Sequence, residues 1–115
     1  MAKVTIKDYV SLCQGVTSEE GQPIYNLIIG ILKSGDIVEL DFDGMTFMTT
    51  AFLNVVIGTL YKDFSSEELR NILKLQNVNE ETATRIKRVT DNAKAFYADK
   101  EGFTAAVEEA MNENK

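Results

Sequence analysis

The apolar residues change their spacing several times along the chain, and this change constrains the fold more than any other feature. In three short segments they alternate with polar residues, as in half-buried strands. Between these segments they recur at three- and four-residue steps, as on one face of a helix. Strands alternating with helices predict an α/β fold with a small mixed sheet covered by helices. The predicted strands run from Lys3 to Val10, from Ile37 to Phe42 and from Ile72 to Leu75.

Helix signals fill the intervals between these strands, and they include caps, first-turn acids and stop residues. No long linker separates the elements, so residues 1–115 are expected to form one domain with a frayed polar tail at 112–115. The predicted helices are one from Ile24 to Gly35 with Pro23 in its first turn, one from Ala51 to Phe64 with a threonine cap, a turn from Ser65 to Glu68, one after Asn77 or Asn79, and one from Lys100 to Met111.

Composition narrows the classes of function. Twelve basic and eighteen acidic residues give a net charge of −6, which opposes binding to nucleic acid and to anionic lipid. The chain has no histidine, which excludes Ser-His-Asp and Cys-His catalysis and zinc sites of the Cys/His kind. Cys13 has no second cysteine to pair with, and no apolar run approaches the roughly 20 residues of a membrane span. We therefore expect a cytoplasmic protein without metal or cofactor.

Hydroxyl side chains gather where the corner Asp43-Gly44 leads into the second long helix. Thr49 or Thr50 can cap that helix, which is what most threonines in such a place do. The same position suits a regulatory phosphate, because the positive end of a helix tolerates a group that adds nearly two negative charges. Residue chemistry alone leaves capping and regulation both open.

The run from Leu40 to Leu53 resembles the central motif of STAS domains, the fold of bacterial anti-sigma factor antagonists. In that family a buried strand leads to a helix whose first residues include a phosphorylatable serine. The segment Thr46-Phe47-Met48 is identical to a common version of the motif, and Thr50 falls on the acceptor serine. Thr49 stands in place of an aspartate and Phe52 in place of a glycine. Both departures resemble the divergent STAS-like family of unknown function.

This resemblance implies a regulatory, protein-binding module without enzymatic activity. The implied partner is an anti-sigma kinase or a related histidine-kinase-like ATPase, contacted by the corner and the helix that follows. Thr50 is the candidate phospho-acceptor, and Asp43, Thr49 and Asn54 are candidate partner-binding residues. Phosphorylation of Thr50 is expected to release the partner through charge repulsion and desolvation.

Two other functions stay open. A passive structural adaptor would bind its partner whatever residue stands at position 50. The run Asp41-Phe42-Asp43-Gly44 is similar to the first motif of haloacid-dehalogenase-type phosphatases, in which two aspartates flank a magnesium ion. The alternative is structural, with Asp41 ending a strand and Asp43-Gly44 forming its turn. Two ligands alone do not complete a metal site, and 115 residues leave little room for the rest.

One concentration of basic residues interrupts the acidic composition. Such charges, interleaved with acids on helices, are typical of a solvated face, and they could instead meet an acidic partner. The four residues are Lys74, Arg85, Lys87 and Arg88.

Overall fold

Three strands pair in parallel to form the main sheet, in the order β1-β3-β5. β1 (Ala2–Thr5) pairs with β3 (Val38–Asp41), whose other edge pairs with β5 (Leu73–Gln76). The computed structural model describes residues 1–98, and every strand pairing among them is parallel, so the expectation of a mixed sheet is wrong. Helical crossovers between successive strands account for the parallel pairing, because they return the chain to the same end of the sheet.

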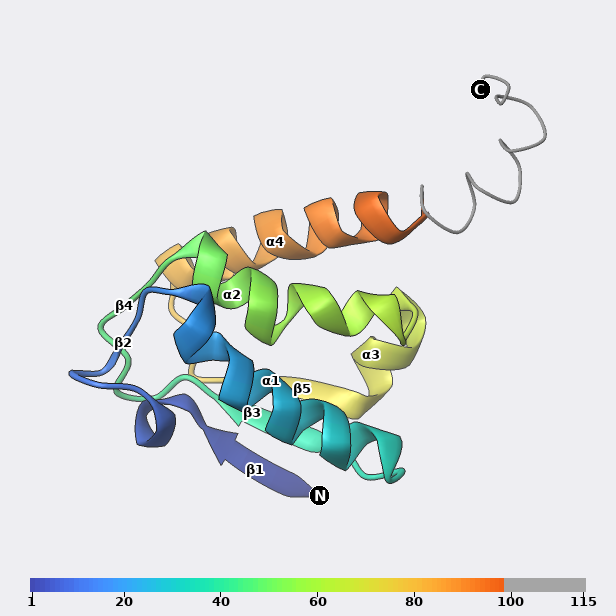
Figure 1. The fold of residues 1–115 in the computed structure, drawn as a ribbon, viewed down its shortest axis with the longest axis horizontal. Coiled ribbons are helices and arrows are strands. Elements are labelled where there is room, and N and C mark those ends of the chain that lie inside the picture. Colours follow the sequence, from blue (N-terminus) through green and yellow to red (C-terminus); the bar gives the residue numbers. More distant parts are fainter. Residues whose placement is uncertain (99–115) are drawn as a thin grey trace.

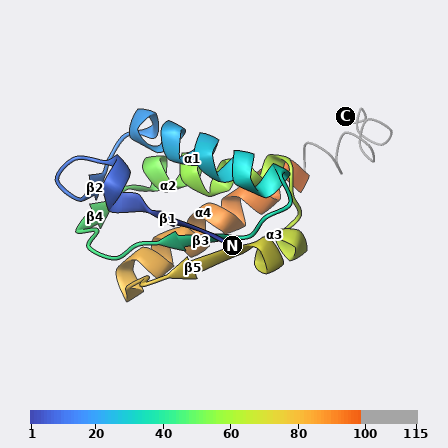
Figure 2. The same ribbon diagram turned by 90° about the horizontal axis from the view of Figure 1, so that it is seen from below.

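The helices cover one face of this sheet (Figures 1 and 2). α1 (Ser18–Lys33) and α2 (Thr50–Val56) pack against each other, and α4 (Glu80–Ala98) packs beside α2. The covered face supplies apolar side chains such as Val4 and Leu40, which are fully buried with residues of α1 and α2. The predicted α/β class is therefore confirmed, and one cluster of buried side chains joins the sheet to the helices.

β1 is shorter than its alternating pattern predicted. After Thr5 the chain turns into a short 3-10 helix, η1 (Ile6–Tyr9), although a strand was predicted as far as Val10. Thr5 lies opposite Asp41, the last residue of β3, so no neighbouring strand remains to continue the ladder. Ile6 instead enters the core, where it is fully buried.

α1 begins earlier than predicted, at Ser18 rather than beside Pro23. The Thr17 hydroxyl accepts a hydrogen bond from the Glu20 N–H at 3.1 Å, and the Glu20 carboxylate accepts from the Thr17 N–H at 3.0 Å. This capping box satisfies two N–H groups that the start of a helix leaves free. Pro23 consequently lies inside the helix, where it removes one hydrogen-bond donor.

The helix predicted from Ala51 to Phe64 is divided in two. α2 ends at Val56, and a 3-10 helix, η2 (Gly58–Lys62), follows after one residue. At Gly58 a Cβ atom would lie 2.6 Å from the Asn54 Oδ1 and 3.3 Å from the Val89 Cγ1 of α4. The tighter of these contacts is with Asn54, one turn earlier in the chain, so local crowding and the neighbouring α4 both favour glycine here. Glycine is a poor residue for continuing an α-helix.

The C-terminal elements follow the predictions more closely. α3 (Ser66–Ile72) starts with a second capping box, formed by Ser65 and Glu68, and leads directly into β5. Asn79 caps α4, since its Oδ1 accepts a hydrogen bond from the Thr82 N–H at 2.7 Å. The helix predicted from Lys100 to Met111 and the tail at 112–115 lie outside the described residues.

Gly15 and Phe52 fit against each other beneath the start of α2. Phe52 is fully buried, and a Cβ atom on Gly15 would lie 2.6–2.7 Å from three carbons of its ring. Real side chains essentially never approach this closely, so the ring is accommodated because position 15 has no side chain.

We expect Gly15→Ala to lower the free energy of unfolding by about 1–3 kcal/mol through overpacking. Adding Phe52→Leu should recover part of the loss, because the smaller side chain vacates the space that the new methyl group needs. Gly30→Ala is the matched control: it lies in α1 with nothing within 4 Å, and it should be neutral or stabilising by up to about 1 kcal/mol. Urea unfolding measures all three, and equal effects at positions 15 and 30 would contradict the packing argument.

Candidate functional site

The corner runs from Asp43 to Thr50 and leads into α2. A pair of very short strands fixes its position. β2 (Gln14–Gly15) and β4 (Phe47–Met48) pair in parallel, with Gly15 opposite Met48. The Thr49 N–H extends this pairing by donating to the Gly15 carbonyl at 2.9 Å. α2 begins at the next residue, so the position of its first turn is set by β2.

Thr49 is the cap of α2, and both functions of its hydroxyl are used. Its Oγ1 accepts a hydrogen bond from the Phe52 N–H at 3.2 Å and donates one to the Val16 carbonyl at 2.6 Å. An aspartate could accept the first bond but could not donate the second. The threonine thus ties the helix start to the chain beyond β2, and Thr49 rather than Thr50 is the capping residue.

Thr50 is the first residue of α2 and its side chain is exposed. It lies at the edge of two surface hollows between α2 and α4, with volumes of about 570 and 350 Å³. The larger hollow also contains Asn54, which is exposed one turn further along α2. The structure therefore brings together two of the predicted site residues, Thr50 and Asn54, on one face of the helix.

Asp43 lies apart from this group. It follows the end of β3, is exposed, and forms an ion pair with Lys7, whose Nζ is 3.7 Å from the Asp43 Oδ2. The turn that follows uses Gly44, whose φ of 80° is a conformation that glycine adopts readily. Asp43 lines neither hollow at Thr50, so its assignment to partner binding stays a prediction without support from this geometry.

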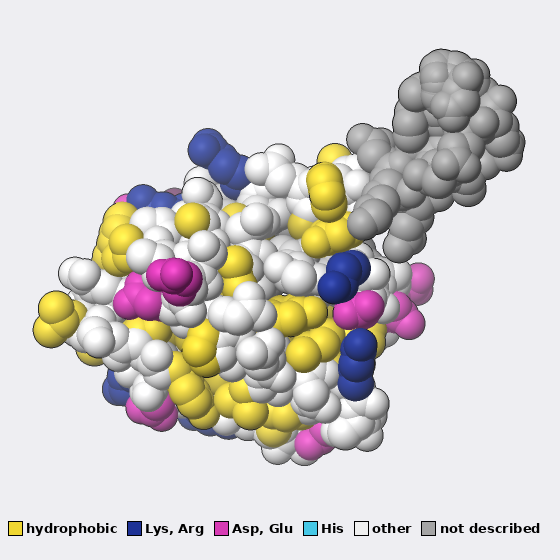
Figure 3. All heavy atoms as spheres, viewed as in Figure 1, with side chains coloured by type: hydrophobic (Ala, Val, Ile, Leu, Met, Phe, Trp, Pro, Cys, Tyr) yellow, Lys and Arg dark blue, Asp and Glu magenta, His cyan; other side chains and the backbone are white. Residues whose placement is uncertain are grey.

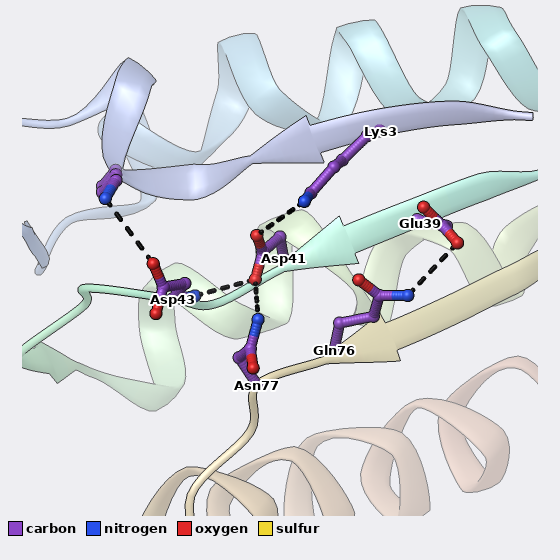
Figure 4. Close-up of polar contacts among 7 residues, drawn as sticks. Lys3, Glu39, Asp41, Asp43, Gln76 and Asn77 are labelled. Carbon is purple, nitrogen blue, oxygen red and sulfur yellow. Dashed lines mark hydrogen bonds and ion pairs between the residues drawn. The ribbon is translucent and has the colours of Figure 1, made fainter.

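Asp41, the last residue of β3, is in contact with side chains from β1 and from the end of β5 (Figure 4). Its Oδ1 accepts hydrogen bonds from the Asn77 side-chain amide at 2.7 Å and from the Asp43 N–H at 3.0 Å. Its Oδ2 lies 3.4 Å from the Nζ of Lys3 on β1. The Asn77 amide first, then the Asp43 N–H and the Lys3 ammonium, hold the pKa of the buried Asp41 carboxyl below its usual range.

These contacts do not fit the magnesium site of a phosphatase. Both oxygens of Asp41 already face donors, and the ammonium of Lys3 supplies the positive charge that a metal ion would bring. Within residues 1–98, no group of three or more His, Cys, Asp or Glu side chains is arranged to hold a metal ion. Asp41 serves here as a structural connection between strands.

Exposed apolar side chains surround the corner, and they were not predicted from the sequence. Leu12 is 84% exposed and Phe47 is 42% exposed, on segments that precede β2 and form β4. Figure 3 shows hydrophobic side chains reaching the surface at this end of the molecule. Leu12 also has a φ of 55°, which is uncommon for a bulky residue.

Two arginines of α4 complete the surroundings of Thr50. Arg85 and Arg88 line the smaller hollow with it, and Arg88 lines the larger one as well. The sequence showed them only as part of a basic concentration, because their distance along the chain conceals their position beside Thr50.

Comparison with protein families matches residues 20–83 to the STAS-like domain of unknown function (DUF4325). The match covers more than half of the chain and includes the whole corner, so the resemblance seen in the motif is confirmed. Comparisons with curated proteins and with solved structures found no match. None of the helices within residues 1–98 has the length and apolar character needed to cross a bilayer.

We expect Thr49→Ala to lower the free energy of unfolding by about 1–2 kcal/mol, because the variant loses the cap and the bond to the Val16 carbonyl. Thr49→Ser keeps both bonds and should retain most of the stability. Thr50→Ala should change stability by at most about 0.5 kcal/mol, since that side chain is exposed. Urea unfolding at neutral pH distinguishes the two positions, and a larger loss at position 50 would contradict the assignment of the cap.

The lowered pKa of Asp41 gives a predicted dependence on pH. A carboxyl whose pKa is lower in the folded state stabilises the fold above its unfolded pKa of about 3.9, and the contribution is lost as pH falls through the folded pKa. Asp41→Asn should therefore be less stable than the unmodified chain at pH 7, and the difference should shrink below about pH 4. Thermal unfolding from pH 7 to pH 2.5 measures the difference, and a constant gap would contradict the charge-dependent role.

Proposed function

The chain belongs to the family of STAS-like domains of unknown function, and on that premise we propose that it is a cytoplasmic regulatory module that docks on a protein partner through the corner at Thr49 and Thr50. STAS-like domains are generally non-enzymatic. The observation that carries the proposal is the exposed hydroxyl of Thr50, placed immediately after a capping residue whose own hydroxyl is fully used.

The surroundings of Thr50 are suited to binding a protein. Apolar side chains at Leu12, Val16 and Phe47 are 41–84% exposed around the corner, and Asn54 adds an amide one turn along α2. Exposed apolar groups beside polar ones are characteristic of protein interaction sites. The proposed partner is a histidine-kinase-like ATPase, which the resemblance to anti-sigma factor antagonists implies.

Phosphorylation at Thr50 is the proposed switch. The Thr50 Oγ1 forms a bond to the γ-phosphorus of ATP, the bond from that phosphorus to the bridging oxygen breaks, ADP leaves, and the hydroxyl proton passes to a base of the kinase. The product carries nearly two additional negative charges at the centre of the docking surface. A partner that bound the neutral hydroxyl would then have to desolvate a dianion, so its affinity falls.

Binding of position-50 variants to a histidine-kinase-like ATPase from the same organism tests the proposal. We expect Thr50→Glu to weaken binding about tenfold or more, a free-energy change of at least about 1.4 kcal/mol, while Thr50→Ala stays within about threefold of the unmodified chain. Asn71→Asp is the control for added negative charge. Asn71 is exposed on α3, at the far end of the molecule from Thr50, so this substitution should leave the affinity unchanged (Figure 1). Calorimetry or biolayer interferometry gives these affinities.

The same experiment separates the switch from a passive adaptor. Equal affinity for all position-50 variants would indicate an adaptor without a switch. Mass spectrometry after incubation with the ATPase and ATP should find phosphate on Thr50, and a chain that never gains it there would remove the phosphorylation step from the proposal.

A further inference from the structure

Two arginines line the smaller hollow at Thr50. The hollow measures about 350 Å³ and is lined by Thr50 from α2 and by Glu81, Thr84, Arg85 and Arg88 from α4. Arg85 and Arg88 are three positions apart, so they project from the same side of the helix. Figure 3 shows Lys or Arg side chains at the surface near the N-terminal half of α4.

The two arginines differ in how they are held. The Arg85 guanidinium lies 3.0 Å from the Glu81 carboxylate and 5.4 Å from the centre of the Phe47 ring, which faces it from β4. These contacts fix Arg85 and partly neutralise it. No ion pair joins Arg88 to a carboxylate within residues 1–98, and Arg88 lines both hollows that Thr50 borders. Glu81 is the one carboxylate among the residues that line the smaller hollow, and it is paired with Arg85.

We propose that a phosphoryl group on Thr50 is bound within the same chain by Arg88, with Arg85 as a second ligand, so that phosphorylation ties the start of α2 to α4. The inference rests on the proposed function in one respect: it takes Thr50 as the modified residue. A guanidinium presents paired donors that match two oxygens of a phosphoryl group, and such charge-assisted bonds are among the strongest that side chains form. Arg88 is exposed, and it forms no ion pair with a carboxylate of residues 1–98.

The bound phosphoryl group changes the surface that a partner meets. It fills the hollow that the unmodified hydroxyl leaves open, and it engages Arg88, which the unmodified protein presents beside Thr50 and Asn54. The partner is therefore excluded by an internal contact as well as by charge. The modified domain also gains a connection between two helices that otherwise meet through packing.

The full chain with phosphothreonine genetically encoded at position 50 tests this without any kinase. In ³¹P NMR titrations, the second pKa of the phosphoryl group should lie roughly half a unit lower in the folded chain than in the same chain in urea. Arg88→Gln should remove most of this shift, and Arg88→Lys should keep part of it. Lys87→Gln is the matched control, because it removes the same charge from the adjacent position, outside the smaller hollow, where Lys87 pairs with Asp91.

Thermal unfolding provides a second readout. In the chain that keeps Arg88, phosphorylation should raise the melting temperature by a few degrees. In Arg88→Gln it should not raise the melting temperature. Equal pKa shifts in Arg88→Gln and Lys87→Gln would overturn the proposal. So would the absence of a shift in the phosphorylated chain without any substitution. The pKa shift and the melting temperature are both measured without the partner. An intact pKa shift without partner switching would refute the proposed function alone. Partner switching without a pKa shift would refute the internal contact alone.

Discussion

The hydroxyl of Thr49 holds the functional end of the molecule together. It accepts from the Phe52 N–H and donates to the Val16 carbonyl, while the Thr49 N–H reaches the Gly15 carbonyl. These bonds join the first turn of α2 to a segment 33 residues earlier in the chain. With Thr49 fixed as the cap, Thr50 is the first residue of α2, and its side chain is exposed.

The polar cluster at Asp41 is a second connection of the same kind, and it explains why two nearby aspartates have different environments. Asp41 is buried and joins β1, β3 and the end of β5 through Lys3 and Asn77. Asp43 is exposed and pairs with Lys7 at the beginning of the turn. A motif of two carboxylates that resembles a metal site in sequence is therefore divided in space between a strand connection and a surface ion pair.

The sequence predicted those features that depend on neighbouring residues. Apolar spacing gave the helices and strands, and side-chain chemistry gave a threonine cap for α2. Prediction from the sequence failed where contacts with distant segments decide where an element ends. β1 ends at Thr5 because β3 ends opposite it. The helix predicted from Ala51 to Phe64 is interrupted before Gly58, a position crowded both by Asn54 and by Val89 of α4. The proximity of Arg88 to Thr50 was likewise hidden, because it depends on how α4 packs beside α2.

The two departures of the corner from the common STAS motif have one structural explanation. Phe52, in the place of a small residue, fills the space beneath the first turn of α2, and only a residue without a side chain at position 15 leaves room for its ring. Thr49, in the place of an acid, donates a hydrogen bond to the carbonyl of Val16, the residue that follows Gly15. Both residues connect α2 to the segment from Gly15 to Val16, Phe52 by packing and Thr49 by a hydrogen bond. A helix start held in this way presents Thr50 at a fixed position, which is what a contact between Thr50 and the arginines of α4 requires.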